Sequence, residues 1–332
     1  MFDKLFKKEK YLDCHNIKHS IHFFYDNIRA CCSNVPGPVF YENYDGRDID
    51  WDYVYKKRKD WIKQINSFRN KKFYPDECAN CFELPSMYSS SKIDDFPNLI
   101  KKVFIQNNMS CNAKCLYCSF GHINNSFKYR VLPVVNSMIS NQILSKNARV
   151  YMSGGEITIS PEFEKMFSTL TGYLDAKVEI LTSGIKYSES IKEAFVNDKC
   201  ILVISLDSSK KETYKKIKQV DCFDSVVNNV KSYISASDYA RNNITLKYIL
   251  VDGINDNKGE ISDFVHLVND LGIKNIRMDV DFVKYKYSET LNIPEYYFDL
   301  YEHFNSLAES LNLNIQTNDQ AKAIIAKKKN SK

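Results

Sequence analysis

Three cysteines in the middle of the chain have the residue type and spacing of a metal-binding loop. Cys111, Cys115 and Cys118 follow a CX3CX2C pattern, so three thiols lie within a short segment. Thiolates are soft ligands that suit iron–sulfur clusters or zinc. Three thiolates leave a four-iron cubane one ligand short, and an open metal position is a place where a substrate can bind. The spacing by itself leaves two interpretations: an open iron–sulfur cluster, or a zinc knuckle or half of a structural zinc site.

A second group of cysteines precedes this loop. Cys78 and Cys81 have the CxxC spacing of a metal-ligand pair, which needs partners from elsewhere in the chain. Cys14 and the adjacent Cys31 and Cys32 are available as partners. The amino terminus lacks an apolar signal core, so secretion is not expected and we expect reduced thiols rather than a disulfide framework. These cysteines therefore predict a second metal site.

The elements that would position these thiols alternate between strands and helices from about residue 102 onward. Short runs rich in Ile, Val and Leu indicate strands buried on both faces, as in a parallel sheet covered by helices. Ser160-Pro161 and Gly272 have the features of a helix start and a helix end. Six strand units predict a β/α barrel or partial barrel, in which chemistry gathers at the carboxyl ends of the strands. The predicted strands cover residues 103–106, 149–153, 178–182, 201–206, 244–251 and 275–280.

The first 98 residues have a different pattern. A hairpin is expected from His22 to Cys31, because Asp26 and Asn27 are residue types that tolerate the positive φ of a tight turn. A helix is expected over residues 50–69, with apolar side chains near one face. We predict three parts: a small cysteine-rich α+β module over 1–98, a barrel over 99–285, and a helical extension over 286–332.

Motifs at the strand ends resemble those of the radical S-adenosylmethionine (SAM, AdoMet) superfamily. The CX3CX2C loop has an aromatic residue, Tyr117, before its last cysteine and follows the first barrel strand. The second strand ends in Ser153-Gly154-Gly155-Glu156, which resembles the GGE motif of that family. Glycines let the backbone approach a ligand closely, and a glutamate accepts hydrogen bonds from an ammonium group. A zinc knuckle predicts none of the later motifs, so their order favours the cluster.

The resemblance implies an α/β fold, a (β/α)6 partial TIM barrel, and a cofactor site. It implies that Cys111, Cys115 and Cys118 bind a [4Fe–4S] cluster whose open iron is chelated by AdoMet. Reductive cleavage then gives methionine and a 5′-deoxyadenosyl radical, which takes a hydrogen atom from an unactivated C–H bond of the substrate. A flavodoxin or ferredoxin is implied as the electron donor. The implied AdoMet-binding residues are Tyr117, Gly154, Gly155, Glu156, Ser183, Ser205, Asp207 and Val251.

The amino-terminal cysteines resemble those of SPASM and twitch modules, which carry auxiliary [4Fe–4S] clusters. In those modules one cysteine precedes a hairpin with a DG turn, and another follows the glycine after four residues. That pattern selects Cys14, Cys32, Cys78 and Cys81 as ligands of one auxiliary [4Fe–4S] cluster, with Cys31 as the alternative to Cys32. The sequence departs from the pattern because the module precedes the barrel and an asparagine replaces the glycine. A zinc site with the same ligands is the alternative.

Two reactions fit such an enzyme, oxidation and epimerisation. Oxidation uses the auxiliary cluster as an electron sink, whereas epimerisation needs a thiol that returns a hydrogen atom to the opposite face of the product radical. Cys222 is the candidate donor, with a small structural cysteine as the alternative. Families with such modules act on ribosomally made peptides and on sugars or aminoglycosides. The first 98 residues carry the cysteines of the auxiliary module and leave no separate domain for recognising a peptide. A carbohydrate or other small substrate is therefore favoured over a peptide.

The composition excludes few classes of protein. Hydrophobic residues make up 44% of the chain and charged residues 26%, as in ordinary globular proteins. A net charge of +5 is mild for 332 residues and does not indicate a nucleic-acid partner. No apolar stretch is long enough to predict a membrane span, and we expect a cytoplasmic protein. The rival from another class is a non-catalytic protein that binds zinc or nucleic acid.

Overall fold

Two compact units make up the chain. The first unit takes in residues 1–108, 127–152 and 172–176, and the second takes in 109–126, 153–171 and 177–332. The computed structural model describes residues 11–31, 38–67, 88–89, 96–118, 128–281, 284–285 and 293–317. Within the first unit, β2 (Ser20–Phe24) pairs with β6 (Ile100–Gln106) in one sheet.

The first unit is built on a sheet in the order β7-β6-β2-β3-β4. Both β7 (Leu144–Met152) and β2 run parallel to β6. The strands β3 (Ile28–Arg29) and β4 (Val39–Tyr41) continue the sheet in antiparallel pairing. A separate two-stranded sheet joins β1 (Tyr11–Leu12) to β5 (Tyr88–Ser89). The amino-terminal segment therefore extends the sheet that carries the first two predicted barrel strands.

The hairpin expected between His22 and Cys31 is confirmed as β2 and β3, in which His22 pairs with Arg29. The expected positive φ in its turn was wrong, because neither Asp26 nor Asn27 has one. The turn is closed by a backbone hydrogen bond in which the Phe24 N–H donates to the Asn27 carbonyl at 3.0 Å.

The helices of the first unit are α1 (His15–His19), α2 (Trp51–Ser67) and α3 (Leu132–Ser140). The helix expected over residues 50–69 is confirmed as α2, but an arginine lies among its buried apolar residues. The Arg58 guanidinium is buried and donates to the carbonyls of Ile17 (2.6 Å) and Ser20 (2.7 Å) at the end of α1. Burial lowers the pKa of Arg58 to about 9. The carbonyls left open at the end of a helix thus find their donors in Arg58.

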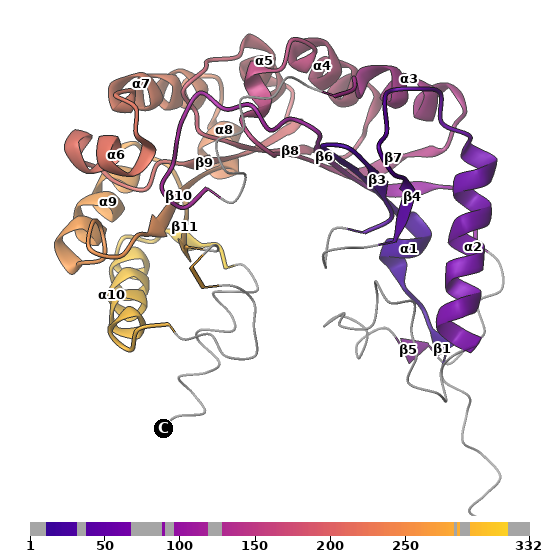
Figure 1. Cartoon of the computed structure of the whole chain (residues 1–332). Coiled ribbons are helices and arrows are strands. Elements are labelled where there is room, and N and C mark those ends of the chain that lie inside the picture. The colour runs from indigo at the N-terminus through magenta and orange to yellow at the C-terminus, as the bar shows by residue number, and fades with distance from the viewer. Residues whose placement is uncertain are drawn as a thin grey trace, which may run out of the picture. The chain divides into compact units, whose positions relative to one another are not determined.

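The second unit holds a parallel sheet in the order β12-β11-β10-β9-β8. Helices alternate with these strands along the chain (Figure 1). All six strands predicted from residue 102 onward are confirmed, as are the helices expected after Ser160 and before Gly272. The strands are β8 (Val178–Thr182), β9 (Cys200–Ser205), β10 (Ile244–Leu250), β11 (Asn275–Val280) and β12 (Asn314–Ile315). The helices are η3 (Ile157–Ile159), α4 (Phe163–Tyr173), α5 (Glu189–Val196), α6 (Lys211–Lys218), α7 (Phe223–Ile234), α8 (Asp238–Asn243), α9 (Lys258–Asp270) and α10 (Tyr296–Ser310).

The two faces of this sheet differ in polarity. Leu202, Leu246 and Ile276 are 0% exposed and belong to the apolar core. Their chain neighbours point to the opposite face because successive strand residues alternate. That face carries charged residues such as Lys247 and Arg277, which are only partly buried. Parallel strands bring their carboxyl ends to one edge, and the predicted site residues follow those ends.

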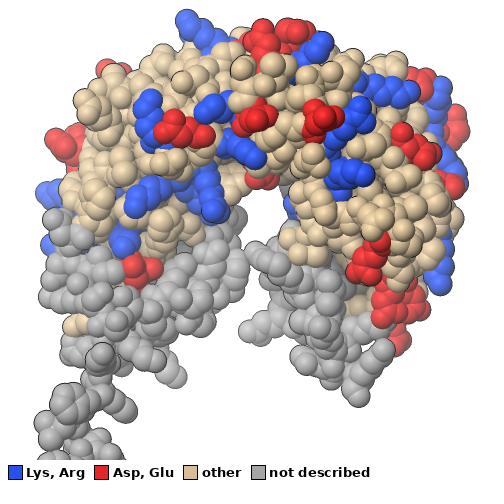
Figure 2. Space-filling model, turned by 180° about the vertical axis from the view of Figure 1, so that it is seen from behind, with Lys and Arg blue, Asp and Glu red and all other residues tan. Residues whose placement is uncertain are grey.

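Two surface properties of the described residues can be stated: the polarity of their helices and the distribution of their charged side chains. None of the described helices has both the length and the apolar character needed to cross a membrane. On the face drawn in Figure 2, lysine and arginine side chains are interspersed with aspartate and glutamate side chains.

Acid should destabilise the first unit through His19. Burial lowers the pKa of His19 from 6.5 to about 4, although its hydrogen bond to the Leu99 carbonyl opposes the shift. The unfolded chain therefore binds more protons than the folded chain between about pH 6.5 and pH 4, and stability falls as the pH falls through that window. We expect a loss on the order of 1–2 kcal/mol, discounted for nearby solvent. Urea unfolding of His19→Asn should lack this part of the pH dependence, whereas the exposed His266→Asn should keep it; equal profiles for both variants would contradict the assignment.

Candidate functional site

The loop with the three closely spaced cysteines, residues 111–118, is held by backbone hydrogen bonds from two sides. The Lys114 N–H donates to the Lys218 carbonyl at the end of α6, at 2.9 Å. From the other side, the Glu156 N–H donates to the Ser110 carbonyl at 2.8 Å. The loop is therefore fixed against both α6 and the GGE turn.

The three thiols of this loop differ in exposure. Cys111 is exposed, whereas Cys115 and Cys118 are partly buried. The Ala113 N–H donates to Cys111 Sγ at 3.4 Å. Partial desolvation of the thiol raises the pKa of Cys111 to about 11, and burial raises that of Cys115 against the opposing charge of Lys218. These two thiols hold their protons until a metal displaces them.

The donor set of this loop bears on the metal group that it could hold. Thiolates are soft ligands of iron–sulfur clusters and of zinc. A structural zinc site takes four protein ligands, whereas three thiolates hold three irons of a [4Fe–4S] cluster and leave the fourth iron open. The three thiols of Cys111, Cys115 and Cys118, carried on one loop, therefore fit an open [4Fe–4S] cluster.

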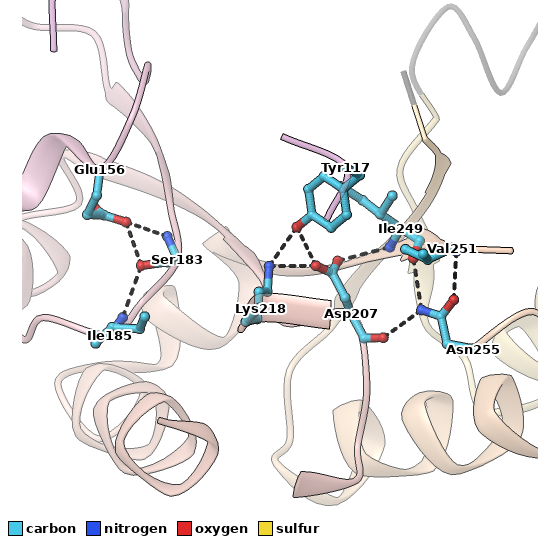
Figure 3. Close-up of polar contacts among 9 residues, drawn as sticks. All are labelled: Tyr117, Glu156, Ser183, Ile185, Asp207, Lys218, Ile249, Val251 and Asn255. Carbon is cyan, nitrogen blue, oxygen red and sulfur yellow. Dashed lines mark hydrogen bonds and ion pairs between the residues drawn. The ribbon is translucent and has the colours of Figure 1, made fainter. Parts of the chain in front are cut away.

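Glu156 is buried, and five hydrogen bonds surround its carboxylate. Its Oε1 accepts from the Thr158 N–H (3.2 Å), the Thr158 hydroxyl (2.7 Å) and the Thr182 hydroxyl (2.7 Å). Its Oε2 accepts from the N–H (2.7 Å) and the hydroxyl (2.6 Å) of Ser183 (Figure 3). These bonds fasten the GGE turn to the end of β8. A carboxylate has about four lone-pair sites, so an ammonium group would bind Glu156 in exchange for one of the hydroxyls.

Gly155 lies so close to the cysteine loop that it predicts a mutational effect. An added Cβ would lie 2.3 Å from the Ser110 carbonyl oxygen and 2.7 Å from the carbonyl carbon of Met109. These are backbone atoms, so they cannot move without moving the loop. We expect Gly155→Ala to lower stability by about 1–3 kcal/mol and to lower iron incorporation, measured by urea unfolding and iron analysis. Gly172→Ala in α4 is the control, because a Cβ there meets nothing within 4 Å; equal iron in both variants would refute the close-contact account.

A buried ion pair joins the cysteine loop to β9 and α6. Lys218 Nζ lies 2.5 Å from Asp207 Oδ2, and the side chains are 1% and 0% exposed. The Tyr117 hydroxyl donates to the same Oδ2 and accepts from Lys218 Nζ at 2.6 Å (Figure 3). Burial opposes the charged form of Lys218, but the charge of Asp207 outweighs it and the pKa of Lys218 is raised. Burial and the charge of Asp207 raise the pKa of Tyr117 well above its usual value, so its hydroxyl stays protonated.

Backbone geometry explains how Asp207 reaches this position. Asp207 has a φ of 63°, a left-handed conformation that aspartate adopts more readily than most residues. Its Oδ1 accepts the Ile249 N–H at 2.9 Å, and its carbonyl accepts from Asn255 Nδ2 at 2.9 Å. Buried Asn255 also accepts the Val251 N–H at 2.7 Å (Figure 3). Asp207 therefore joins the ends of β9 and β10 and positions Tyr117.

Most of the residues predicted to bind AdoMet lie in one part of the second unit. The cysteine loop contacts the GGE turn through Ser110, and that turn contacts Ser183 through Glu156. Ser205 is the last residue of β9, and Val251 directly follows β10. The predicted residues therefore gather where the parallel strands end.

The amino-terminal cysteines are described only in part. Cys32, Cys78 and Cys81 lie outside the described residues. Cys14 is buried in an apolar cluster of the first unit, and its Sγ accepts the Ile17 N–H of α1 at 3.5 Å. Cys31 is partly buried. The auxiliary cluster and its ligands stay a prediction.

Two residues of the site were missed in the sequence. Lys218 is one of several lysines of α6 and looks solvated like the others, so no local signal distinguishes it. Asn255 follows β10 in a segment that resembles an ordinary turn, and its bond to the Asp207 carbonyl joins residues far apart in the sequence.

Comparison with known proteins agrees with this geometry. Residues 109–268 match the family described as the Radical SAM superfamily. The GTP 3′,8-cyclase of Petrotoga mobilis is 25% identical over 246 residues, which cover 69% of this chain and 71% of that protein. A protein named GTPase Obg from Brachyspira hyodysenteriae is 25% identical over 173 residues, which cover 48% of this chain and 25% of that protein. The crystal structure of Streptococcus suis SuiB has a TM-score of 0.52 at 13% identity, covering 82% of this chain and 56% of that chain.

Residues 109–268 therefore match a radical SAM domain, and the cysteine loop, the GGE turn and the buried ion pair all lie within these residues. The likeness to SuiB shows the fold, which is mixed α/β with a parallel sheet, as expected. The described strands form no closed barrel. The chain spans a quarter of the length of the GTPase Obg relative and little more than half of SuiB.

Proposed function

We propose that this chain is a radical SAM enzyme that removes a hydrogen atom from an unactivated C–H bond of a small molecule. When bound, a [4Fe–4S] cluster and AdoMet would supply the 5′-deoxyadenosyl radical that takes the hydrogen atom. The observation that carries the proposal is the loop of Cys111, Cys115 and Cys118, which is hydrogen-bonded to the GGE turn and lies within the residues that match the Radical SAM superfamily.

Different residues of the chain would bind the cluster, bind AdoMet and position the cysteine loop. The three thiolates would hold three irons and leave the fourth open for AdoMet. The GGE turn would bring backbone and the Glu156 carboxylate to the AdoMet amino group, with Ser183 beside it. Ser205 and Val251 would face the ribose and adenine from the ends of β9 and β10. The pair of Asp207 and Lys218 would hold Tyr117 and, through it, the loop.

Anaerobic reconstitution of the full chain tests this proposal. We expect about four irons per chain for the open cluster alone and about eight if the auxiliary cluster is also present. With a reductant such as flavodoxin or ferredoxin, the protein should convert AdoMet to 5′-deoxyadenosine and methionine. Stoichiometric zinc without iron would reject the proposal in favour of a zinc-binding protein.

The substrate belongs to the proposal. A carbohydrate or other small molecule is the first candidate, and the GTP 3′,8-cyclase of Petrotoga mobilis supports it because its name gives a nucleotide substrate. A ribosomally made peptide is the second candidate, because SuiB has been crystallised with its precursor peptide SuiA. Small-molecule and peptide fractions of an extract should be compared for stimulation of 5′-deoxyadenosine release.

The reaction type is proposed as oxidation or epimerisation. Oxidation would use an auxiliary [4Fe–4S] cluster on Cys14, Cys78, Cys81 and Cys32, or Cys31 in its place. Epimerisation would use Cys222, which precedes α7 and is partly buried, as hydrogen donor. Deuterium from solvent should enter the product only in the second case, and a Cys222→Ala variant that still inverts its substrate removes Cys222 as donor.

A further inference from the structure

A row of polar residues crosses three neighbouring strands on the charged face of the second unit. Lys247 of β10 pairs in register with Ser205 of β9 on one side and with Arg277 of β11 on the other. Register partners in a parallel sheet point to the same face. All three residues are partly buried, whereas Leu246 and Ile276 on the opposite face are fully buried in the core. The row therefore lies on the face that is not part of the apolar core.

Most charges on this face are paired. Asp207 pairs with Lys218, and Arg277 pairs with Asp279 through Nε–Oδ1 (3.0 Å) and Nη2–Oδ2 (2.8 Å). Among the described residues, the Lys247 ammonium has no hydrogen bond and no carboxylate oxygen within ion-pair distance. Glu179 lies on the same face, but its register partner is Ile201, four residues before Ser205 along β9, so it lies nearer the amino ends of the strands than Lys247 does. Within the part of the chain that the structure describes, no carboxylate forms an ion pair with Lys247.

The protein environment disfavours the charged form of Lys247. Burial lowers the pKa of Lys247, and the charges of Asp279 and Asp207 only partly offset that effect. A partly buried charge of this kind is typical of binding sites, where a ligand supplies the partner.

The surroundings of Lys247 fit an anionic oxygen group. Arg277 has five N–H donors, of which Nε–H is hydrogen-bonded to Asp279 Oδ1 and Nη2 lies at ion-pair distance from Oδ2, so donors remain beside the lysine. A lysine and an arginine side by side suit a carboxylate or a phosphate. The N–H groups of Leu206 and Asp207 donate to the Lys247 carbonyl, each at 3.1 Å, so this row is attached directly to the proposed AdoMet site.

We propose that Lys247 and Arg277 form a subsite that binds an anionic oxygen group of the substrate, a carboxylate or a phosphate. The inference rests on the proposed function and narrows its substrate to an anionic molecule. The subsite holds that group on the charged face of β10 and β11, next to the strand end that carries Asp207.

Inorganic phosphate and acetate are the probes for this subsite. The melting temperature of the reconstituted full chain is measured against each anion at constant ionic strength, because a ligand of the folded state raises it with concentration. We expect the melting temperature of the wild type to rise with the anion. Lys247→Met should bind the effective anion at least roughly tenfold more weakly. Lys247→Arg, which keeps the charge, should retain the response. The exposed Lys231→Met in α7 is the matched control and should respond like the wild type.

The same variants separate the subsite from other roles of Lys247. Without added anion, Lys247→Met should melt at the wild-type temperature or above it, because the variant removes an unpaired cation. A lower melting temperature would show that Lys247 stabilises the fold, and it would overturn the proposal. An unchanged anion response in Lys247→Met, or none in the wild type, also overturns it. AdoMet affinity should not change in Lys247→Met; a roughly tenfold loss assigns the subsite to the cofactor's own carboxylate. An anion response without AdoMet cleavage by the wild type would reject only the proposed function.

Discussion

Replacing Cys111, Cys115 and Cys118 together with alanine should remove about four irons per chain and abolish formation of 5′-deoxyadenosine. The three thiolates are the ligands that would hold the open cluster, and no other described cysteine lies in the same loop. Because Cys111 is exposed and the others are only partly buried, the alanines should leave the fold intact. Iron analysis, the cluster's electron paramagnetic resonance signal and chromatography of AdoMet products measure the three effects.

Two single variants serve as controls for this result. Cys222→Ala should keep both the iron and the cleavage, because Cys222 lies outside the loop and is not proposed as a ligand. Cys31→Ala should keep cleavage as well, since any cluster in the first unit is separate from the open one. If the triple variant still forms 5′-deoxyadenosine, the assignment of these cysteines to the cluster is wrong.

The parallel sheet of the second unit was predictable because its signals are local. Strands buried on both faces need continuous apolar runs, and the runs at residues 178–182 and 275–280 match β8 and β11 in both bounds. The order of the site followed from the same physics, since parallel strands bring their carboxyl ends together. Gly154-Gly155-Glu156 and Ser183 could be placed near each other for that reason, and the Glu156–Ser183 hydrogen bonds confirm this placement.

The interactions that stabilise the site were not predictable, because they join residues far apart in sequence. Nothing local distinguishes Lys218 from the exposed lysines of α6, and its burial depends on the position of Tyr117, about a hundred residues earlier. Arg58 likewise interrupts an apolar helix face because α1 has carbonyls that need donors. The pairing of β2 with β6 was missed because the sequence of a strand does not indicate which strand lies beside it.

Breaking the buried pair of Asp207 and Lys218 should cost the chain about 3–5 kcal/mol of stability. In Lys218→Met the Asp207 carboxylate keeps its hydrogen bonds from Tyr117 and the Ile249 N–H but loses the cation that compensates its charge. Asp207→Asn leaves the opposite charge buried and should cost a similar amount. Urea unfolding of the chain without added iron measures the loss, and iron content after reconstitution shows whether the loop still binds its cluster.

The double variant Asp207→Asn, Lys218→Met separates the cost of an unpaired charge from the loss of packing. Because it removes both charges, it should recover most of the stability lost by either single variant, a non-additivity that marks direct coupling. Iron incorporation should recover less, because Tyr117 would no longer be held between two charges. Lys211→Met is the matched control: Lys211 lies on the same helix as Lys218, but its pair with Asp224 of α7 is exposed, so no change in stability is expected. Additive losses in the double variant would show that Asp207 and Lys218 act separately, and the loop would then depend on its backbone hydrogen bonds to α6 and the GGE turn.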